Sequence, residues 1–275
     1  MASPEKKAFL LRIDPTLWAE IERLAAAELR SANAQVEFLL RQALADRGIQ
    51  PQTMRKPKPV REPEFVRPVK MNAAEGRMNS WDEKYGAPGH YYGTEPNDFL
   101  RERYAVIPAG GRVLCLAEGE GRNAVFLAQQ GYRVVAVDRS PVGLRKAQAL
   151  AAERGVQIET AVADLADYPI TPGHWDGIVS IWCHLPQPLR AAVHGQVVAG
   201  LKPGGIFLLE AYTPAQLRYG TGGPKSVDLL PTLAELQMEL AGLDFVLAEE
   251  REREIHEGHG HAGLSAVVDI VAVKR

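Results

Sequence analysis

The 275-residue chain has few cysteines and no long apolar run, and these absences limit what it can be. Its two cysteines, Cys115 and Cys183, stand in short, strand-like apolar segments, which predicts buried thiols in a reducing compartment. No apolar run reaches the length of a membrane span, and the charged N-terminus lacks the pattern of a signal peptide. The net charge of −2 gives no global attraction to nucleic acid or to a membrane surface. We therefore expect a cytoplasmic globular protein with no membrane partner.

Composition divides the chain into three zones. Residues 1–47 are patterned like a small module, and residues 71–275 are long enough for one α/β domain. Between them, residues 48–70 contain five prolines and six basic side chains against two acidic ones, which is typical of an extended, semi-rigid linker. The linker charges either contact phosphate or only keep the segment solvated.

The first zone has the pattern of one strand followed by two helices. Residues 7–14 alternate as a short strand, Asp14-Pro15 starts a helix, and a second helix ends at Gly48. Three such elements cannot bury a sufficient core alone, whereas pairing the strand with a second copy of itself solves that problem. With AFLLRIDP and RSANAQVEFLL the zone resembles the ribbon–helix–helix family, which implies a homodimer formed through residues 6–47.

Members of that family insert the outward residues of the paired strands into the DNA major groove. Here those positions hold Ala8, Leu10 and Arg12. Arginine suits guanine, but alanine and leucine offer no hydrogen bonds to base edges. The resemblance therefore implies a dimerisation module at least as well as a DNA-binding one.

The third zone alternates strand-like and helical apolar runs. Strands are expected near residues 112–117, 133–138, 157–162, 176–182, 204–211, 245–255 and 264–273, and helices near 121–130, 140–154, 188–201 and 231–241. This alternation predicts an α/β fold, a Rossmann-like sheet of seven mostly parallel strands with helices on both faces. Because only a short turn joins the last two strands, the last one is antiparallel. The charged run 249–254 suits an exposed edge strand, with Arg251 and Arg253 in solvent.

The segment 113–123, VLCLAEGEGRN, joins an apolar strand through a glycine-rich turn to a helix, and the next strand, VVAVD, ends at Asp138. Strand, tight turn, helix and a strand ending in an acid form the layout of a nucleotide-binding βαβ unit. Glu118 and Glu120 stand in the turn, where carboxylates repel a pyrophosphate and attract a ligand that bears an ammonium and a sulfonium. The pattern therefore favours S-adenosylmethionine over NAD.

Residues 80–275 resemble the class I S-adenosylmethionine-dependent methyltransferases. Within that class, WDEKYGAPGHYYGTEPNDFL and GEGRNAVFLA resemble small-molecule methyltransferases of the tellurite-resistance and thiopurine type. The resemblance implies that the loop residues Ala117, Glu118, Gly119, Gly121 and Asn123 contact the cofactor and that Asp138 binds its ribose. It also implies that Arg139, Asp164 and Leu165 surround the adenine. Trp182 would lie near the methyl group, and Trp81 and Tyr92 would form a lid.

Two loop positions depart from the family pattern. The family has an acid where this chain has Cys115, and a glycine where it has Ala117. We hypothesise that Glu118 replaces the missing carboxylate as the partner of the cofactor ammonium.

Side chains for the methyl acceptor are expected where the fourth and fifth strands end, because ligands sit beyond the carboxyl ends of parallel strands. His184 and Tyr212 stand there and are the predicted catalytic residues. A thiolate or chalcogen anion needs little base catalysis, whereas an amine or hydroxyl needs a deprotonating group such as His184. The spacing of His256, His259 and His261 invites a metal, but a glycine-rich hairpin explains them as well, and no metal site is predicted.

Two functions remain open on the sequence. The first is a methyltransferase that transfers a methyl group in line from S-adenosylmethionine to a small molecule, such as a thiol or a chalcogen oxyanion. The alternative is a DNA-binding regulator whose C-terminal domain binds S-adenosylmethionine as a sensor. Methylation of RNA or protein is disfavoured, because the acidic C-terminal domain lacks a broad basic face.

Overall fold

The computed structural model describes residues 14–27, 32, 35–36, 39, 80–258 and 260–275. The chain divides into two compact units, Met1–Ala73 and Ala74–Arg275. In the first unit, helix α1 (Pro15–Ala27) begins where the Asp14 carboxylate accepts a hydrogen bond from the Thr16 N–H, as predicted. The predicted strand over 7–14 and most of the second helix lie outside the described residues, so a homodimer and DNA contacts through this zone stay predictions.

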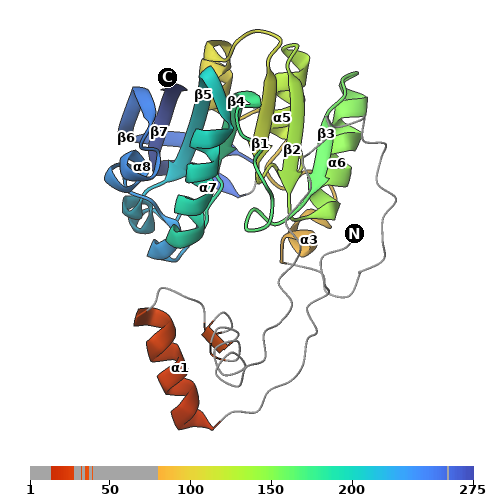
Figure 1. The fold of residues 1–275 in the computed structure, drawn as a ribbon. Coiled ribbons are helices and arrows are strands. Elements are labelled where there is room, and N and C mark those ends of the chain that lie inside the picture. Colours follow the sequence, from red (N-terminus) through yellow and green to blue (C-terminus); the bar gives the residue numbers. More distant parts are fainter. Residues whose placement is uncertain (1–13, 28–31, 33–34, 37–38, 40–79, 259) are drawn as a thin grey trace, which may run out of the picture. The chain divides into compact units, whose positions relative to one another are not determined.

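The second unit is built on one seven-stranded sheet (Figure 1). Its strands are β1 (Arg112–Leu116), β2 (Arg133–Asp138), β3 (Glu159–Val162), β4 (Trp175–Ile181), β5 (Leu201–Tyr212), β6 (Leu243–Glu257) and β7 (His261–Lys274). They lie in the order β3-β2-β1-β4-β5-β7-β6, with β1 to β5 parallel and β7 antiparallel to both of its neighbours. The predicted α/β fold with an antiparallel last strand is confirmed, and β6 is the edge strand that its charges indicated.

Helices cover both faces of this sheet (Figure 1). They are α3 (Ser80–Tyr85), α4 (Asp98–Arg103), α5 (Arg122–Gln129), α6 (Pro141–Glu153), α7 (Gln187–Gly200) and α8 (Leu233–Glu239), with 3-10 turns η1 (Tyr104–Val106), η2 (Pro214–Arg218) and η3 (Val227–Leu229). Along β1, Leu114 and Leu116 pack in the core that includes α7 and α8, while Val113 and Cys115 pack in the core that includes α4 and α5. Helices α5 to α8 match the four predicted ones, and the pattern did not indicate α3 and α4.

Both cysteines are free thiols. Cys115 is fully buried, as predicted, whereas Cys183 is only partly buried. Within the described part of the chain, none of the helices combines the length and the apolar character needed to cross a bilayer.

A glycine is required where the β1 loop passes into α5. Gly121 has a φ of 91°, and a Cβ added there would lie 2.4 Å from the Cβ of Ala147. Gly121→Ala is expected to lower the free energy of unfolding by about 2–4 kcal/mol, because a left-handed backbone and an overpacked contact add. Urea denaturation measures this loss. Gly131→Ala is the matched control: its φ is 87°, but nothing lies within 4 Å of the added Cβ. It should lose only about 1–2 kcal/mol, and equal losses in the two variants would contradict the packing argument.

Candidate active site

A cavity of about 710 Å³ lies at the carboxyl ends of β1, β2 and β4, where the strand order reverses between β1 and β4. Its wall also includes residues of α3, of the segment after α3 and of the β6–β7 hairpin. Most predicted site residues are in this wall: Trp81, Tyr92, Ala117, Glu118, Asn123, Asp138, Arg139, Asp164, Leu165, Trp182 and His184. Segments that are far apart in the sequence thus meet at one cavity.

Three predicted site residues, Gly119, Gly121 and Tyr212, do not line the cavity. Gly119 donates its N–H to Asp138 Oδ2 at 2.8 Å, and Gly121 packs against α6. The Tyr212 ring is fully buried, and its hydroxyl lies 2.7 Å from Nδ1 of His261, which is itself a wall residue. These three residues shape the wall from behind it.

The backbone is strained at two wall positions. Ala117 has a φ of 50° and Trp182 a φ of 56°, and among the described residues no other non-glycine has a positive φ. Such a conformation costs about 1–3 kcal/mol and is concentrated at functional sites. Ala117 therefore keeps the backbone that a glycine would favour, which accounts for the family's preference at this position.

Glu118 precedes helix α5 and faces the cavity. Its Oε1 accepts hydrogen bonds from the N–H groups of Asn123 at 3.0 Å and Ala124 at 2.8 Å, in the first turn of the helix. Burial raises the pKa of Glu118 to about 7, and these two bonds oppose the rise. Burial, with Glu118 beside it, also raises the pKa of the Cys115 thiol, which therefore stays protonated. The loop thus holds a carboxyl next to the strand position where the family has its acid.

Glu120, the second acid of the loop, is committed to protein contacts. It is buried, pairs with Lys146 Nζ at 2.9 Å and accepts the N–H of Tyr91 at 2.7 Å. Lys146 also donates to the carbonyls of Ala87 and Gly89. Glu120 therefore ties the segment after α3 to the glycine-rich loop, and Glu118 is left as the loop acid without a cation in ion-pair contact among the described residues.

Asp138 ends β2 and joins the loop to helix α6. Its two carboxylate oxygens accept one backbone N–H each, from Gly119 at 2.8 Å and from Ser140 at 2.7 Å. Burial raises the pKa of Asp138, and the two bonds oppose that rise. Each oxygen keeps a further lone pair, so Asp138 can still accept hydrogen bonds from a ligand.

Five rings form a continuous aromatic stack along the cavity. Tyr92 stacks on His261 at 4.6 Å between centroids, His261 on Trp182 at 5.0 Å, Trp182 on Tyr212 at 4.4 Å, and Tyr212 on His184 at 5.6 Å. The rings come from a loop, from β5, from β7 and from the end of β4. Because the inner rings of the stack cover one another's faces, the stack forms a rigid, apolar part of the wall.

His184 is a neutral imidazole with one unused nitrogen. Its Nδ1 lies 3.1 Å from the carbonyl oxygen of Leu229, which only accepts, so Nδ1 carries the proton. Its Nε2 is buried and has no hydrogen-bond partner among the described residues. Burial lowers the pKa of His184 to about 4, so the ring is uncharged near neutral pH and Nε2 holds a free lone pair.

The two hairpin histidines that the structure describes have different surroundings. His256 is exposed, His261 belongs to the aromatic stack, and His259 lies outside the described residues. Burial lowers the pKa of His261 to about 3. The part of the chain that the structure describes contains no group of three or more histidine, cysteine or acidic side chains placed to hold a metal.

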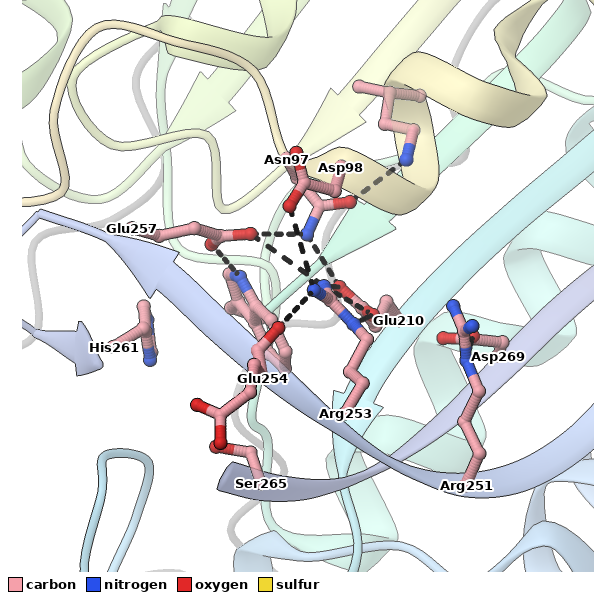
Figure 2. A network of polar contacts seen from close by, with 12 residues as sticks. Asn97, Asp98, Glu210, Arg251, Arg253, Glu254, Glu257, His261, Ser265 and Asp269 are labelled. Carbon is pink, nitrogen blue, oxygen red and sulfur yellow. Dashed lines mark hydrogen bonds and ion pairs between the residues drawn. The ribbon is translucent and has the colours of Figure 1, made fainter. Parts of the chain in front are cut away.

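A buried polar network, which the sequence did not indicate, lies next to the cavity (Figure 2). Glu257 accepts hydrogen bonds from Arg122 at 2.6 Å and from the Trp182 indole at 2.7 Å. Asn97 donates to Glu257 and to Glu210, so that the start of α4 is tied to β5 and β6. The network therefore holds the Trp182 indole through Glu257, which is itself bound by Arg122 of α5 and by Asn97 before α4.

The expectation that Arg251 and Arg253 are solvated is wrong for Arg253. Its side chain is 13% exposed and donates two hydrogen bonds, each 2.8 Å long, to Glu210 (Figure 2). Arg251 is more exposed, but it pairs with the buried Asp269 at 2.6 Å. Glu210 and Asp269 are opposite each other in the β5–β7 register, and burial raises the pKa of Glu210 to about 8, with Asp269 adding to the rise. The arginines reach inward because two carboxyls in apolar strands need them.

Comparisons with known proteins agree with this geometry. Residues 113–205 match the family described as a methyltransferase domain. A thiopurine S-methyltransferase from Bordetella petrii is 30% identical over 169 residues, 60% of this chain and 74% of that protein. A 2-heptyl-1-hydroxyquinolin-4(1H)-one methyltransferase from Mycobacteroides abscessus is 28% identical over 129 residues, 46% of this chain and 56% of that protein. The chain spans about half the length of the latter relative.

Solved structures show the same fold. TehB from Haemophilus influenzae superimposes with a TM-score of 0.53 at 21% identity, over 65% of this chain and 62% of that chain. The chain belongs to the class I S-adenosylmethionine-dependent methyltransferases, and S-adenosylmethionine is its cofactor. These two relatives are each named for a small-molecule acceptor.

Proposed function

We propose that the cavity binds S-adenosylmethionine along Asp138, Glu118 and Trp182 and a planar aromatic acceptor beside His184, with methyl transfer to a sulfur or oxygen of that acceptor. The observation that carries the proposal is that one cavity wall combines two acids suited to the cofactor with a neutral imidazole whose Nε2 is unpartnered. The two named relatives support the class of acceptor, because a thiopurine and a hydroxyquinolinone are both planar heteroaromatic compounds.

The donor set fits the charges of this cofactor, which supplies a methyl group on a positively charged sulfur when it is bound. Asp138 has lone pairs left for ribose hydroxyls. Both backbone hydrogen bonds to Glu118 use Oε1, so Oε2 is not engaged by helix α5 and suits an ammonium.

The residues around the acceptor have distinct tasks. The aromatic stack orients a planar acceptor and keeps water away from it, which supplies proximity in a water-poor site. His184 would accept the acceptor proton at Nε2, so that the acceptor oxygen or sulfur attacks the methyl group as an anion and S-adenosylhomocysteine leaves. Burial raises the pKa of Cys183 to about 12, so this wall thiol stays protonated and is not a nucleophile.

A methyl-transfer screen on the full chain tests the proposal. Labelled S-adenosylmethionine is offered with aromatic thiols, hydroxylated heteroaromatics, aliphatic thiols, chalcogen oxyanions, and DNA or RNA. We expect the aromatic thiols and hydroxyls to be methylated fastest. Turnover of nucleic acid alone, or no turnover by a protein that binds the cofactor, would contradict the proposal.

Glu118 should make cofactor binding depend on pH. Its pKa of about 7 means that it is half protonated near neutral pH, and a ligand ammonium favours the ionised form. The affinity for S-adenosylhomocysteine is therefore expected to rise by about tenfold between about pH 6 and about pH 8. Calorimetry across this range measures the effect.

Glu118→Gln is the matched control, because its amide oxygen can still accept the N–H groups of Asn123 and Ala124 while the side chain no longer titrates. This variant should bind S-adenosylhomocysteine more weakly and with an almost flat pH profile. A pH slope that persists unchanged in Glu118→Gln would rule out Glu118 as its source.

A further inference from the structure

Lys84 is a cation in the cavity wall with unused hydrogen-bond donors. Its Nζ lies 3.4 Å from the Tyr92 hydroxyl, and no carboxylate is within ion-pair distance of it in the described part of the second unit. An ammonium has three N–H donors. Lys146, by contrast, uses its donors on two carbonyls and on Glu120. Lys84 therefore has donors that its protein neighbours do not satisfy.

Aromatic rings surround this ammonium. Nζ lies 4.4 Å from the centroid of the Trp81 ring, 4.9 Å from that of Tyr91 and 5.8 Å from that of Tyr92. Ring faces attract the positive charge, but they do not replace the hydrogen bonds that water would make. Burial accordingly lowers the pKa of Lys84. The rings hold the charge in place and leave its N–H groups for a ligand in the cavity.

The other charged groups of the wall near this position do not suit an anion. Arg122 is 6% exposed and is bound to Glu257 at 2.6 Å. The wall acids Glu118 and Asp138 are suited to the positive and hydroxyl groups of the cofactor. Arg139, the third cation of the wall, follows Asp138 at the end of β2, away from α3 in the chain and beside the acid proposed for the ribose. A negatively charged group on the α3 side of the cavity therefore finds its complement at Lys84.

We propose that Lys84, within the rings of Trp81, Tyr91 and Tyr92, is the anion-binding residue of this cavity and takes a carboxylate of its ligands. The carboxylate belongs either to the methionine part of the methyl donor or to an acidic substituent of the acceptor. The inference rests on the proposed function, since it assumes that both ligands bind in this cavity.

Lys84→Met tests the assignment, because methionine keeps much of the length and the ring contacts and removes the charge. Calorimetry on the full chain compares S-adenosylhomocysteine, which carries the carboxylate, with 5′-methylthioadenosine, which lacks the amino-acid part. If the methyl donor supplies the carboxylate, Lys84→Met lowers the affinity for S-adenosylhomocysteine by about ten- to a hundredfold, which is the loss typical of one charged hydrogen bond. The affinity for 5′-methylthioadenosine stays unchanged. If the acceptor supplies it, the Michaelis constant for ortho-mercaptobenzoate rises by a similar factor, while the constant for thiophenol does not change.

Two further variants separate charge from fold. Lys84→Arg should restore most of the lost affinity, and Lys274→Met, which removes the same charge at the opposite end of the sheet, should behave like the wild type. The inference is overturned if the wild type binds S-adenosylhomocysteine and Lys84→Met changes neither carboxylate-bearing ligand. If the wild type itself binds no S-adenosylhomocysteine, the proposed function fails and the inference fails with it.

Discussion

Replacing Glu257 with alanine is expected to lower the free energy of unfolding by about 3–5 kcal/mol, the loss typical of a broken buried ion pair. Glu257 is 5% exposed; its hydrogen-bond partners are Asn97, Arg122 and Trp182, and Arg253 forms a longer ion pair with it at 3.8 Å. Without it the buried Arg122 guanidinium loses its ion-pair partner, and the amide and indole N–H groups lose their acceptor. Because Trp182 lines the cavity, the affinity for S-adenosylhomocysteine should fall as well. Urea denaturation and calorimetry measure the two effects.

Two other variants in β6 serve as controls for the loss of stability in Glu257→Ala. His256→Ala alters the exposed neighbour of Glu257 and should change stability by no more than about 0.5 kcal/mol. Glu257→Gln keeps the shape and one acceptor oxygen, and should recover part of the stability that alanine loses. If Glu257→Ala proves as stable as His256→Ala, the network of Figure 2 does not stabilise the fold.

The second large effect is expected in catalysis. His184→Phe keeps a ring against Tyr212 and removes Nε2, so kcat with an aromatic hydroxyl acceptor should fall by about 10²- to 10⁴-fold. With an aromatic thiol, which is largely ionised without help, the fall should be less than about tenfold. The affinity for S-adenosylhomocysteine should not change. Steady-state kinetics with one acceptor of each kind measures the contrast.

The control is His174→Phe, the same substitution before β4 at the opposite end of the strand, which should leave kcat unchanged for both acceptors. Since burial lowers the pKa of His184 to about 4, its protonation should not reduce the wild-type rate above about pH 5. Equal falls for the thiol and the hydroxyl acceptor would mean that His184 supports the site structurally and does not move a proton.

The architecture and much of the cavity wall follow from local patterns in the sequence. The strand-turn-helix pattern of 113–130 and the acid at Asp138 are local, since they depend on periodicity, on turn residues and on neighbours within one βαβ unit. The side chains after strand ends, such as Asp164 and His184, were predictable because parallel strands bring their carboxyl ends to one edge. Glu210 and Asp269 are acids inside apolar strands, which indicates that they are buried and need charged partners. The pattern does not indicate which residues those partners are.

The pairing of the buried charges depends on contacts between segments that are far apart in the sequence. The hydrogen-bond partners of Glu257 stand 160, 135 and 75 residues away along the chain, and Arg253 reaches Glu210 across 43 residues. Strand alternation assigns a side chain to a face, but it does not say whether another segment covers that face, which is why Arg253 was expected in solvent. Tyr212 was likewise predicted at the site because it ends β5. Its ring is buried, and its hydroxyl lies against Nδ1 of His261. Long polar side chains choose partners by proximity in space, and that proximity arises only when the sheet, the hairpin and the segment before β1 have packed together.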